Sequence, residues 1–190
     1  MKNNKTFFIL LAVFVAVLVG AWLLYDNLGS QFGSASLATQ DTTAPEATAS
    51  ASSMAPDFTV TDRDGKEVDL YDFHGKPIIV NFWASWCGPC KSEMPDIEAA
   101  YQAYGEDIHF LIINLTDGSR ETVASAASYI QQEGYTFPVY YDTTTEAATT
   151  YHAYSIPTTY FIDAAGNGVA YYTGAMSSAI LQQGIDMILP

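Results

Sequence analysis

A strand that leads through two cysteines into a helix constrains this chain more than any other feature. Residues 78–83 (IIVNFW) form a largely β-branched and aromatic run, which favours a buried central strand. The sequence WCGPC follows at residues 86–90, and apolar residues then recur every three or four positions up to Gly105. That spacing predicts one face of a helix that ends at the glycine. The cysteine pair therefore stands where a central strand turns into a helix.

The spacing of Cys87 and Cys90 favours a disulfide that is made and broken over one that stabilises the fold. A bridge between residues three apart closes so small a loop that it stabilises by only about 2 kcal/mol. One helical turn brings the two Cα atoms to roughly 5–6 Å, so a disulfide needs little backbone movement. At the helix N-terminus, free N–H groups and the helix dipole favour the Cys87 thiolate. We expect Cys87 to be the nucleophile and Cys90, shielded one turn further on, to be the resolving thiol.

A zinc site and an inert structural disulfide are two other uses of such a pair. The chain has only two cysteines, and His74, His109 and His152 show no ligand spacing, so no metal site is predicted. Lys91 rather than histidine follows the second cysteine, which excludes a c-type haem attachment site. An inert disulfide remains an alternative, but CGPC flanked by tryptophan and set between a strand and a helix is typical of a redox site.

Strand-like and helix-like segments alternate along the rest of the chain. A hairpin is expected where Asp64-Gly65 separates residues 58–60 from residues 66–68. The alternation predicts an α/β domain with a largely parallel core. Further strands are expected at 108–115, 137–141, 157–163 and 169–174, and further helices at 119–133, 143–153 and 177–189.

Residues 6–25 form an uncharged apolar segment (TFFILLAVFVAVLVGAWLLY). As a helix this segment extends roughly 30 Å, the thickness of the bilayer hydrocarbon core. Lys2 and Lys5 precede it and Asp26 follows, so the positive-inside bias places residues 1–5 in the cytoplasm and the rest of the chain outside. We expect a single-pass transmembrane anchor. A cleaved signal peptide is the alternative, although its apolar region is ordinarily shorter.

Residues 26–55 are rich in Ser, Ala, Thr and Gly and are expected to form a flexible linker ahead of a folded domain at residues 56–190. All 21 acidic residues but only five of the seven basic ones follow residue 25, which gives this part of the chain a charge of −16. Such a surface offers nothing to a phosphate backbone, so nucleic-acid binding is excluded. It also does not attract anionic lipid headgroups.

Four motifs make the chain resemble the thioredoxin superfamily, and within it the membrane-anchored TlpA/ResA-like thiol-disulfide oxidoreductases. The resemblance covers roughly residues 56–189. The motifs are APDF at residues 55–58, VNFWASWCGPC at residues 80–90, Pro95 within the following helix, and IPTT at residues 156–159. Pro95 is expected to kink its helix.

The resemblance implies a thioredoxin-like α/β fold, with a central mixed β-sheet flanked by helices and an N-terminal β-hairpin. Residues 116–141 would be the helix and strand that this family inserts in the middle of the fold. Pro157 would be the family's cis-proline, beside the cysteines and presenting backbone to an extended substrate. The residues expected to face the substrate are Trp86, Gly88, Pro89, Ile156 and Pro157.

The same resemblance assigns a proton-transfer role to Glu93. Thioredoxin has a buried aspartate six positions before the first cysteine, and Asn81 stands there in this chain. TlpA/ResA-like proteins often have a glutamate three residues after the second cysteine, which Glu93 matches. Its carboxylate would exchange a proton with Cys90 if burial raises its pKa toward neutrality. The alternative is a water-exposed partner of the helix dipole, and Asp96 and Glu98 are read as a solvated face.

The function that the resemblance implies is a protein disulfide reductase of exported proteins, for example apocytochrome c. Reduced Cys87 would attack a client disulfide, and a membrane thiol transporter of the CcdA type would recharge the pair. No cofactor beyond the Cys87–Cys90 disulfide is expected, and the protein is expected to be a monomer. Reduction potentials in this fold span about 150 mV, so a disulfide oxidant or isomerase stays an alternative.

Two other classes of function are open from the sequence. Thiol peroxidases share this fold, but they place Thr or Ser three residues before the reactive cysteine, and Ala84 is found there. A membrane-tethered binding module without catalysis would not depend on Cys87 at all. Peroxide consumption and the effect of Cys87→Ser distinguish these classes from the reductase.

Overall fold

Strand β4 (Ile78–Trp83) lies inside the sheet and carries the chain into the cysteine pair. The computed structural model describes residues 38–39 and 53–189. Within it, β4 pairs in parallel with β5 (His109–Asn114) and antiparallel with β7 (Thr158–Ile162). All six β4 residues are buried, as their composition predicts for a central strand.

The sheet is mixed, as the family resemblance implies, and not largely parallel. Among the described strands, only β4–β5 and β5–β6 are parallel pairs. A tight turn after Asp163 joins β7 to β8, and strands joined by so short a connection must be antiparallel neighbours. The described strands have the order β1-β8-β7-β4-β5-β6-β2-β3. The bounds of the remaining strands are β1 (Ala38–Thr39), β2 (Thr59–Thr61), β3 (Glu67–Asp69), β6 (Val139–Tyr141) and β8 (Gly168–Thr173).

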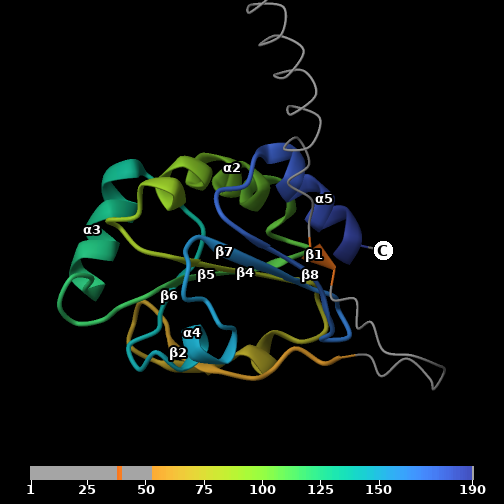
Figure 1. The fold of residues 1–190 in the computed structure, drawn as a ribbon, viewed down its shortest axis with the longest axis horizontal. Coiled ribbons are helices and arrows are strands. Elements are labelled where there is room, and N and C mark those ends of the chain that lie inside the picture. The colour runs from red at the N-terminus through yellow and green to blue at the C-terminus, as the bar shows by residue number, and fades with distance from the viewer. Residues whose placement is uncertain (1–37, 40–52, 190) are drawn as a thin grey trace, which may run out of the picture. The chain divides into compact units, whose positions relative to one another are not determined.

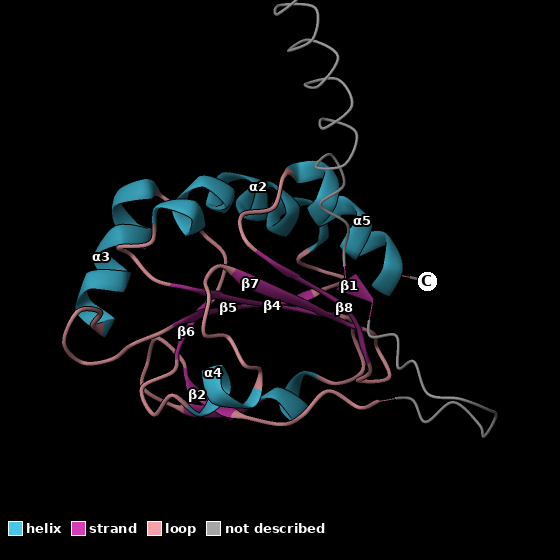
Figure 2. Ribbon diagram, in the orientation of Figure 1, coloured by secondary structure: helices cyan, strands magenta, loops and turns pink. Residues whose placement is uncertain are grey.

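Helices cover both faces of this sheet. Helices α2 (Gly88–Tyr104), α3 (Val123–Glu133) and α5 (Ser178–Ile188) lie over one face, as Figure 1 shows. Helix α4 (Glu146–Thr150) and the short 3-10 helix η1 (Leu70–Phe73) lie on the other face (Figure 2). The three longer helices therefore share the face from which the cysteines are reached.

The alternation of side chains along β4 divides the core into two clusters. Ile79 and Trp83 belong to the cluster beneath α2, α3 and α5, whereas Ile78, Val80 and Phe82 belong to the cluster on the α4 side. Residues of one strand that are two apart point to the same face, so Asn81 lies on the side of α2. The strand thus places a buried amide under the cysteine-bearing helix.

Two helices are shorter than the sequence pattern predicts. Helix α3 begins at Val123 and not at 119, because the side chain of Asp117 accepts N–H bonds from Ser119 and Glu121 and holds them in a loop. Helix α4 covers only part of the expected 143–153, and its preceding residue, Thr145, has a left-handed φ of 64°. Side-chain hydrogen bonds and a single backbone angle set these boundaries, and hydrophobic periodicity does not predict either of them.

Pro95 lies inside helix α2, where it was expected to cause a kink. Helix α2 runs from Gly88 to Tyr104 without a break at Pro95, so the proline does not end it.

Met54 forms a bridge with Asn167, so backbone pairing begins before residue 56. The expected transmembrane segment, residues 6–25, lies outside the described residues. Among the residues that are described, none of the helices has both the length and the apolar character needed to cross a bilayer.

Candidate active site

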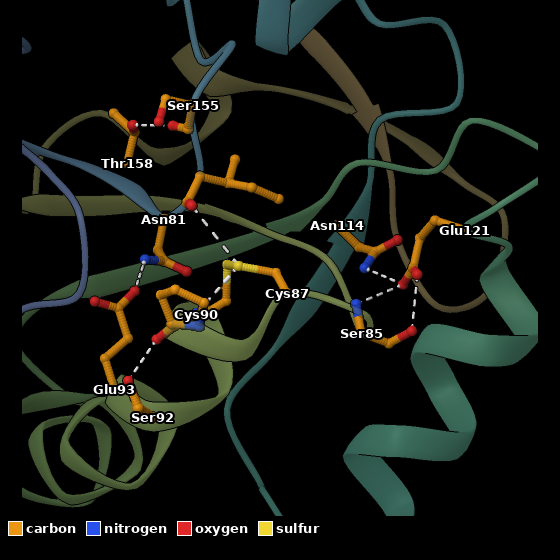
Figure 3. The surroundings of a disulfide bond; sticks show 12 residues. Asn81, Ser85, Cys87, Cys90, Ser92, Glu93, Asn114, Glu121, Ser155 and Thr158 are labelled. Atoms are coloured by element: carbon orange, nitrogen blue, oxygen red, sulfur yellow. Dashed lines mark hydrogen bonds between the residues drawn. A yellow bond between two sulfur atoms is a disulfide. The ribbon is translucent and has the colours of Figure 1, made fainter.

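Cys87 and Cys90 form a disulfide at the N-terminus of α2, with their Cα atoms 5.3 Å apart (Figure 3). Cys87 is the N-cap residue, with extended φ and ψ of −82° and 107°, and its Sγ accepts the Cys90 N–H at 3.2 Å. Cys87 keeps 4% of its surface exposed and Cys90 none. This is the asymmetry expected of a nucleophile and a resolving thiol, because only the first cysteine keeps any contact with solvent.

The residues around Cys87 form an exposed edge at the start of α2. Trp86 is 44% exposed, and Gly88 and Pro89 are also exposed. The guanidinium carbon of Arg120 lies 3.6 Å from the centre of the Trp86 ring, a cation–π geometry. These three residues are accessible to a client protein, and their role in binding one remains a prediction.

The peptide bond between Ile156 and Pro157 is cis, which confirms the conformation that the family resemblance implies. The carbonyl oxygen of Ile156 lies 3.7 Å from Cys87 Sγ. Pro157 is buried and Ile156 is half-buried. The chain segment before β7 therefore lies directly beside the reactive sulfur, although the two segments are 69 residues apart in sequence.

Glu93 is buried, with 1% of its surface exposed, and does not project into water as a helix-dipole partner would. Its Oε1 accepts the Asn81 Nδ2–H at 2.8 Å and its Oε2 accepts the Met176 N–H at 2.8 Å. Burial raises the pKa of the Glu93 carboxyl from 4.5 to about 7, although the two hydrogen bonds lower it and the charge of Asp96 raises it slightly. A carboxyl with this pKa can gain or lose a proton near neutral pH.

Asn81 links this carboxyl to the strand that carries the cysteine pair. Its Nδ2 donates to Glu93 and, at 2.9 Å, to Thr159 Oγ1, while its buried Oδ1 has no hydrogen-bond partner. Cys90 and Glu93 are three residues apart on α2, so they lie on the same face of the helix. The arrangement places one titratable carboxyl on the same face of α2 as the resolving thiol, one helical turn further on.

Comparison with known proteins places these features in a family. Residues 51–170 match the model of the AhpC/TSA family. The chain is 34% identical over 139 residues to the thiol-disulfide oxidoreductase ResA of Geobacillus kaustophilus, which covers 73% of this chain and 78% of that protein. The chain belongs to the AhpC/TSA family.

Solved structures agree with this membership. A Chlorobium tepidum protein described as the thiol:disulfide interchange protein DsbE superposes on this AhpC/TSA protein with a TM-score of 0.65 and 27% identity, over 73% of this chain and 97% of that one. StoA from Bacillus subtilis superposes with a TM-score of 0.60 and 25% identity, over 70% and 98% of the two chains. The thioredoxin-like α/β fold predicted from the motifs is confirmed.

Glu98 of this AhpC/TSA protein is half-buried, on the face predicted to be solvated, and it makes several hydrogen bonds there. Its carboxylate accepts hydrogen bonds from the N–H and Oγ–H of Thr136, from the Phe137 N–H and from Gln102. Burial opposes its ionisation, but these donors outweigh that effect and lower the pKa of Glu98. The residue ties the middle of α2 to the segment between α3 and β6.

A second buried carboxylate, Glu121, is absent from the sequence-based set of site residues. It accepts hydrogen bonds from the backbone N–H and the Oγ–H of Ser85, two residues before Cys87, and from Asn114 Nδ2 (Figure 3). Ser85 and Glu121 are 36 residues apart. Neither spacing nor periodicity pairs them, and the only signal was the presence of an acidic residue just before a helix.

The three histidines lie apart from the disulfide. The His74 ring stacks against Tyr71, the His109 ring contacts Phe73, and His152 is exposed. Within residues 53–189 no group of three or more His, Cys, Asp or Glu is arranged to hold a metal ion.

Proposed function

We propose that this protein is a thiol-disulfide oxidoreductase that reduces disulfides in exported client proteins. The observation that carries the proposal is a disulfide at a helix N-terminus, flanked by the exposed Trp86, Gly88 and Pro89, with a buried carboxyl of near-neutral pKa one helical turn beyond Cys90. The names of the ResA and DsbE relatives support the same activity.

The reaction divides into two exchanges between sulfur atoms. The Cys87 thiolate attacks one sulfur of the client disulfide, forms a mixed disulfide and releases the first client thiolate. The Cys90 thiolate then attacks Cys87 Sγ and releases the second client thiolate. The client gains two electrons and two protons, and the cysteine pair loses both. Glu93 would take the proton from Cys90 before the second step, which makes it a candidate acid–base group.

We propose further that the protein works outside the cytoplasm, held there by a transmembrane helix at residues 6–25. In this arrangement a linker that begins at residue 26 lets the domain reach clients, of which apocytochrome c is one candidate. A membrane thiol transporter of the CcdA type would return electrons to the disulfide, and no bound cofactor would take part. Protease treatment of intact spheroplasts tests the topology: digestion of the domain supports it, and full protection contradicts it.

Reduction of a protein disulfide by the full-length chain tests the activity. We expect the dithiol form to reduce insulin, Cys87→Ser to abolish the reaction, and Cys90→Ser to accumulate the mixed disulfide. Peroxide consumption without a disulfide substrate would instead indicate a thiol peroxidase, and cellular activity that survives Cys87→Ser would indicate a binding module.

A redox titration tests the direction of exchange. We expect a reduction potential nearer to the thioredoxin value of about −270 mV than to the DsbA value of about −120 mV. A value close to the latter would contradict the reductant and favour an oxidant or isomerase.

A further inference from the structure

The carboxylate of Glu121 is completely buried, yet all three of its hydrogen-bond donors are uncharged groups. The Ser85 N–H and Oγ–H donate to it at 2.9 and 2.7 Å, and Asn114 Nδ2 donates at 2.8 Å. Burying an ionised carboxylate is costly unless such bonds compensate for lost water. The role of the carboxylate therefore depends on the groups that it holds in place, Ser85 and Asn114.

What it holds is the turn that delivers Cys87 to the helix. The Cys87 N–H donates to the Ala84 carbonyl at 3.1 Å, which makes Ser85 and Trp86 the two central residues of a turn. Glu121 binds the first of them through two hydrogen bonds. The neighbouring Arg120 covers the ring of the second. Arg120 and Glu121, which precede α3, thus each contact one of the two central residues of the turn.

The position of this turn sets the electrostatics of the reactive sulfur. Cys87 stabilises a thiolate only while its extended N-cap conformation keeps Sγ within 3.2 Å of the Cys90 N–H. If the turn loosens, Sγ moves away from the helix N-terminus and the thiol pKa rises. Because Asn114 is also buried, loss of the carboxylate would leave its amide and the Ser85 N–H without their partner.

We propose that Glu121 is a positioning residue for thiol–disulfide exchange, which holds the turn from Ala84 to Cys87 so that the Cys87 sulfur stays at the N-terminus of α2. Glu121 does not touch the reacting sulfurs and acts through Ser85. The proposal rests on the proposed function, since it assigns a residue to that same reaction.

The pH profile of Cys87 alkylation by iodoacetamide tests this role in the full-length chain. A Cys90→Ser background leaves Cys87 as the only thiol. Glu121→Ala is expected to slow alkylation at pH 7 about three- to tenfold, as follows from a rise in thiol pKa of roughly 0.5 to 1. Ser85→Ala, which removes only the Oγ–H bond, is expected to slow it less. Glu121→Gln keeps an acceptor for the Ser85 N–H and is expected to stay within about twofold of the parent.

Glu98→Ala is the matched control, because it removes another multiply bonded glutamate, one on α2 that binds the far end of the same inserted segment. It should lower the melting temperature and leave the alkylation profile unchanged. If Glu121→Ala lowers the melting temperature but keeps the parent profile, the residue is merely structural and the proposal is wrong.

If Glu121→Ala does not fold, Ser85→Ala decides the matter in the same assay. An unchanged profile for this variant counts against the proposal. The alkylation rate is measured whether or not the protein reduces insulin, so failure of this inference and failure of the proposed function can be told apart.

Discussion

Among single residues, Glu93 has a protonation near neutral pH that depends on the fold. Its pKa is about 7 when buried against Asn81 and Met176, and 4.5 is its ordinary value. The folded state therefore binds a proton between these values that the unfolded chain has released. The contribution to stability is fully present below pH 4.5 and is lost as the pH rises through about 7, by roughly 3 kcal/mol in all.

Replacing Glu93 with Gln should remove this pH dependence. We expect the free energy of unfolding of the parent to fall between pH 5 and pH 8, and that of Glu93→Gln to lose this decrease. Urea unfolding at each pH measures both. Glu133→Gln, which changes an exposed glutamate at the end of α3, is the control and should retain the parental slope. Equal slopes for parent and Glu93→Gln would contradict the assigned pKa.

The same substitution should change the titration of the resolving thiol. An ionised carboxylate beside Cys90 disfavours the thiolate, so Glu93→Gln is expected to lower the Cys90 thiol pKa by about one unit. Alkylation of Cys90 against pH, in a Cys87→Ser background, measures the change. An unchanged profile would remove Glu93 from the proton-transfer step.

The sequence predicted the residues whose roles depend on local spacing and missed those that depend on distant pairing. Cys87 and Cys90 were placed by their position in a strand–helix junction, and Glu93 by its spacing from the second cysteine. Ser85 and Glu121 meet only because β4 and β5 are neighbours, so that the ends of both strands approach one another. The spacing of residues along the sequence does not show that these two residues are close in space.

At the level of elements, the packing of α5 on β7 depends on a glycine. A Cβ at Gly184 would lie 2.2 Å from two ring atoms of Phe161, far inside van der Waals contact. The buried leucine and isoleucines of α5 pack in the same cluster. This helix therefore approaches the sheet as closely as its backbone allows.

Gly184→Ala should consequently destabilise the protein, even though alanine favours helices. We expect a loss of about 1–3 kcal/mol from overpacking. Gln183→Ala, at an exposed position in the same helix, should change stability by no more than about 0.5 kcal/mol. Chemical unfolding of both variants gives the comparison. A Gly184→Ala protein as stable as the Gln183→Ala protein would show that the ring of Phe161 moves freely.

Elements with a strong apolar pattern were predicted better than those bounded by polar side chains. Strands β4 and β5 follow from their runs of buried residues, and the end of α3 follows from Gly134, which has a left-handed φ of 75°. The start of α3 depends on the side chain of Asp117, and the direction of each strand depends on connections that composition does not encode. The hydrophobic pattern thus predicted where the elements lie, but it did not predict the direction of the strands or the exact ends of the elements.

For the molecule as a whole, charge is the dominant long-range property. The part after residue 25 carries −16, so its field attracts basic clients and repels acidic ones beyond about 10 Å at low salt. We expect the reduced protein to react severalfold faster with a lysine-rich disulfide peptide than with its glutamate-rich counterpart at low ionic strength. Raising NaCl to about 0.5 M should bring the two rates together. Stopped-flow kinetics test this, and rates independent of salt would contradict it.

The segment between β5 and β6 is fastened at both of its ends to the structure that carries the cysteines. Glu121 joins one end to the turn before Cys87, and Glu98 joins the other, at Thr136 and Phe137, to α2. Because hydrogen bonds hold both ends of this segment, residues in its middle can be substituted without moving the structure that its ends contact. Substitutions on the outward face of α3 are therefore expected to leave the geometry of the cysteine pair unchanged.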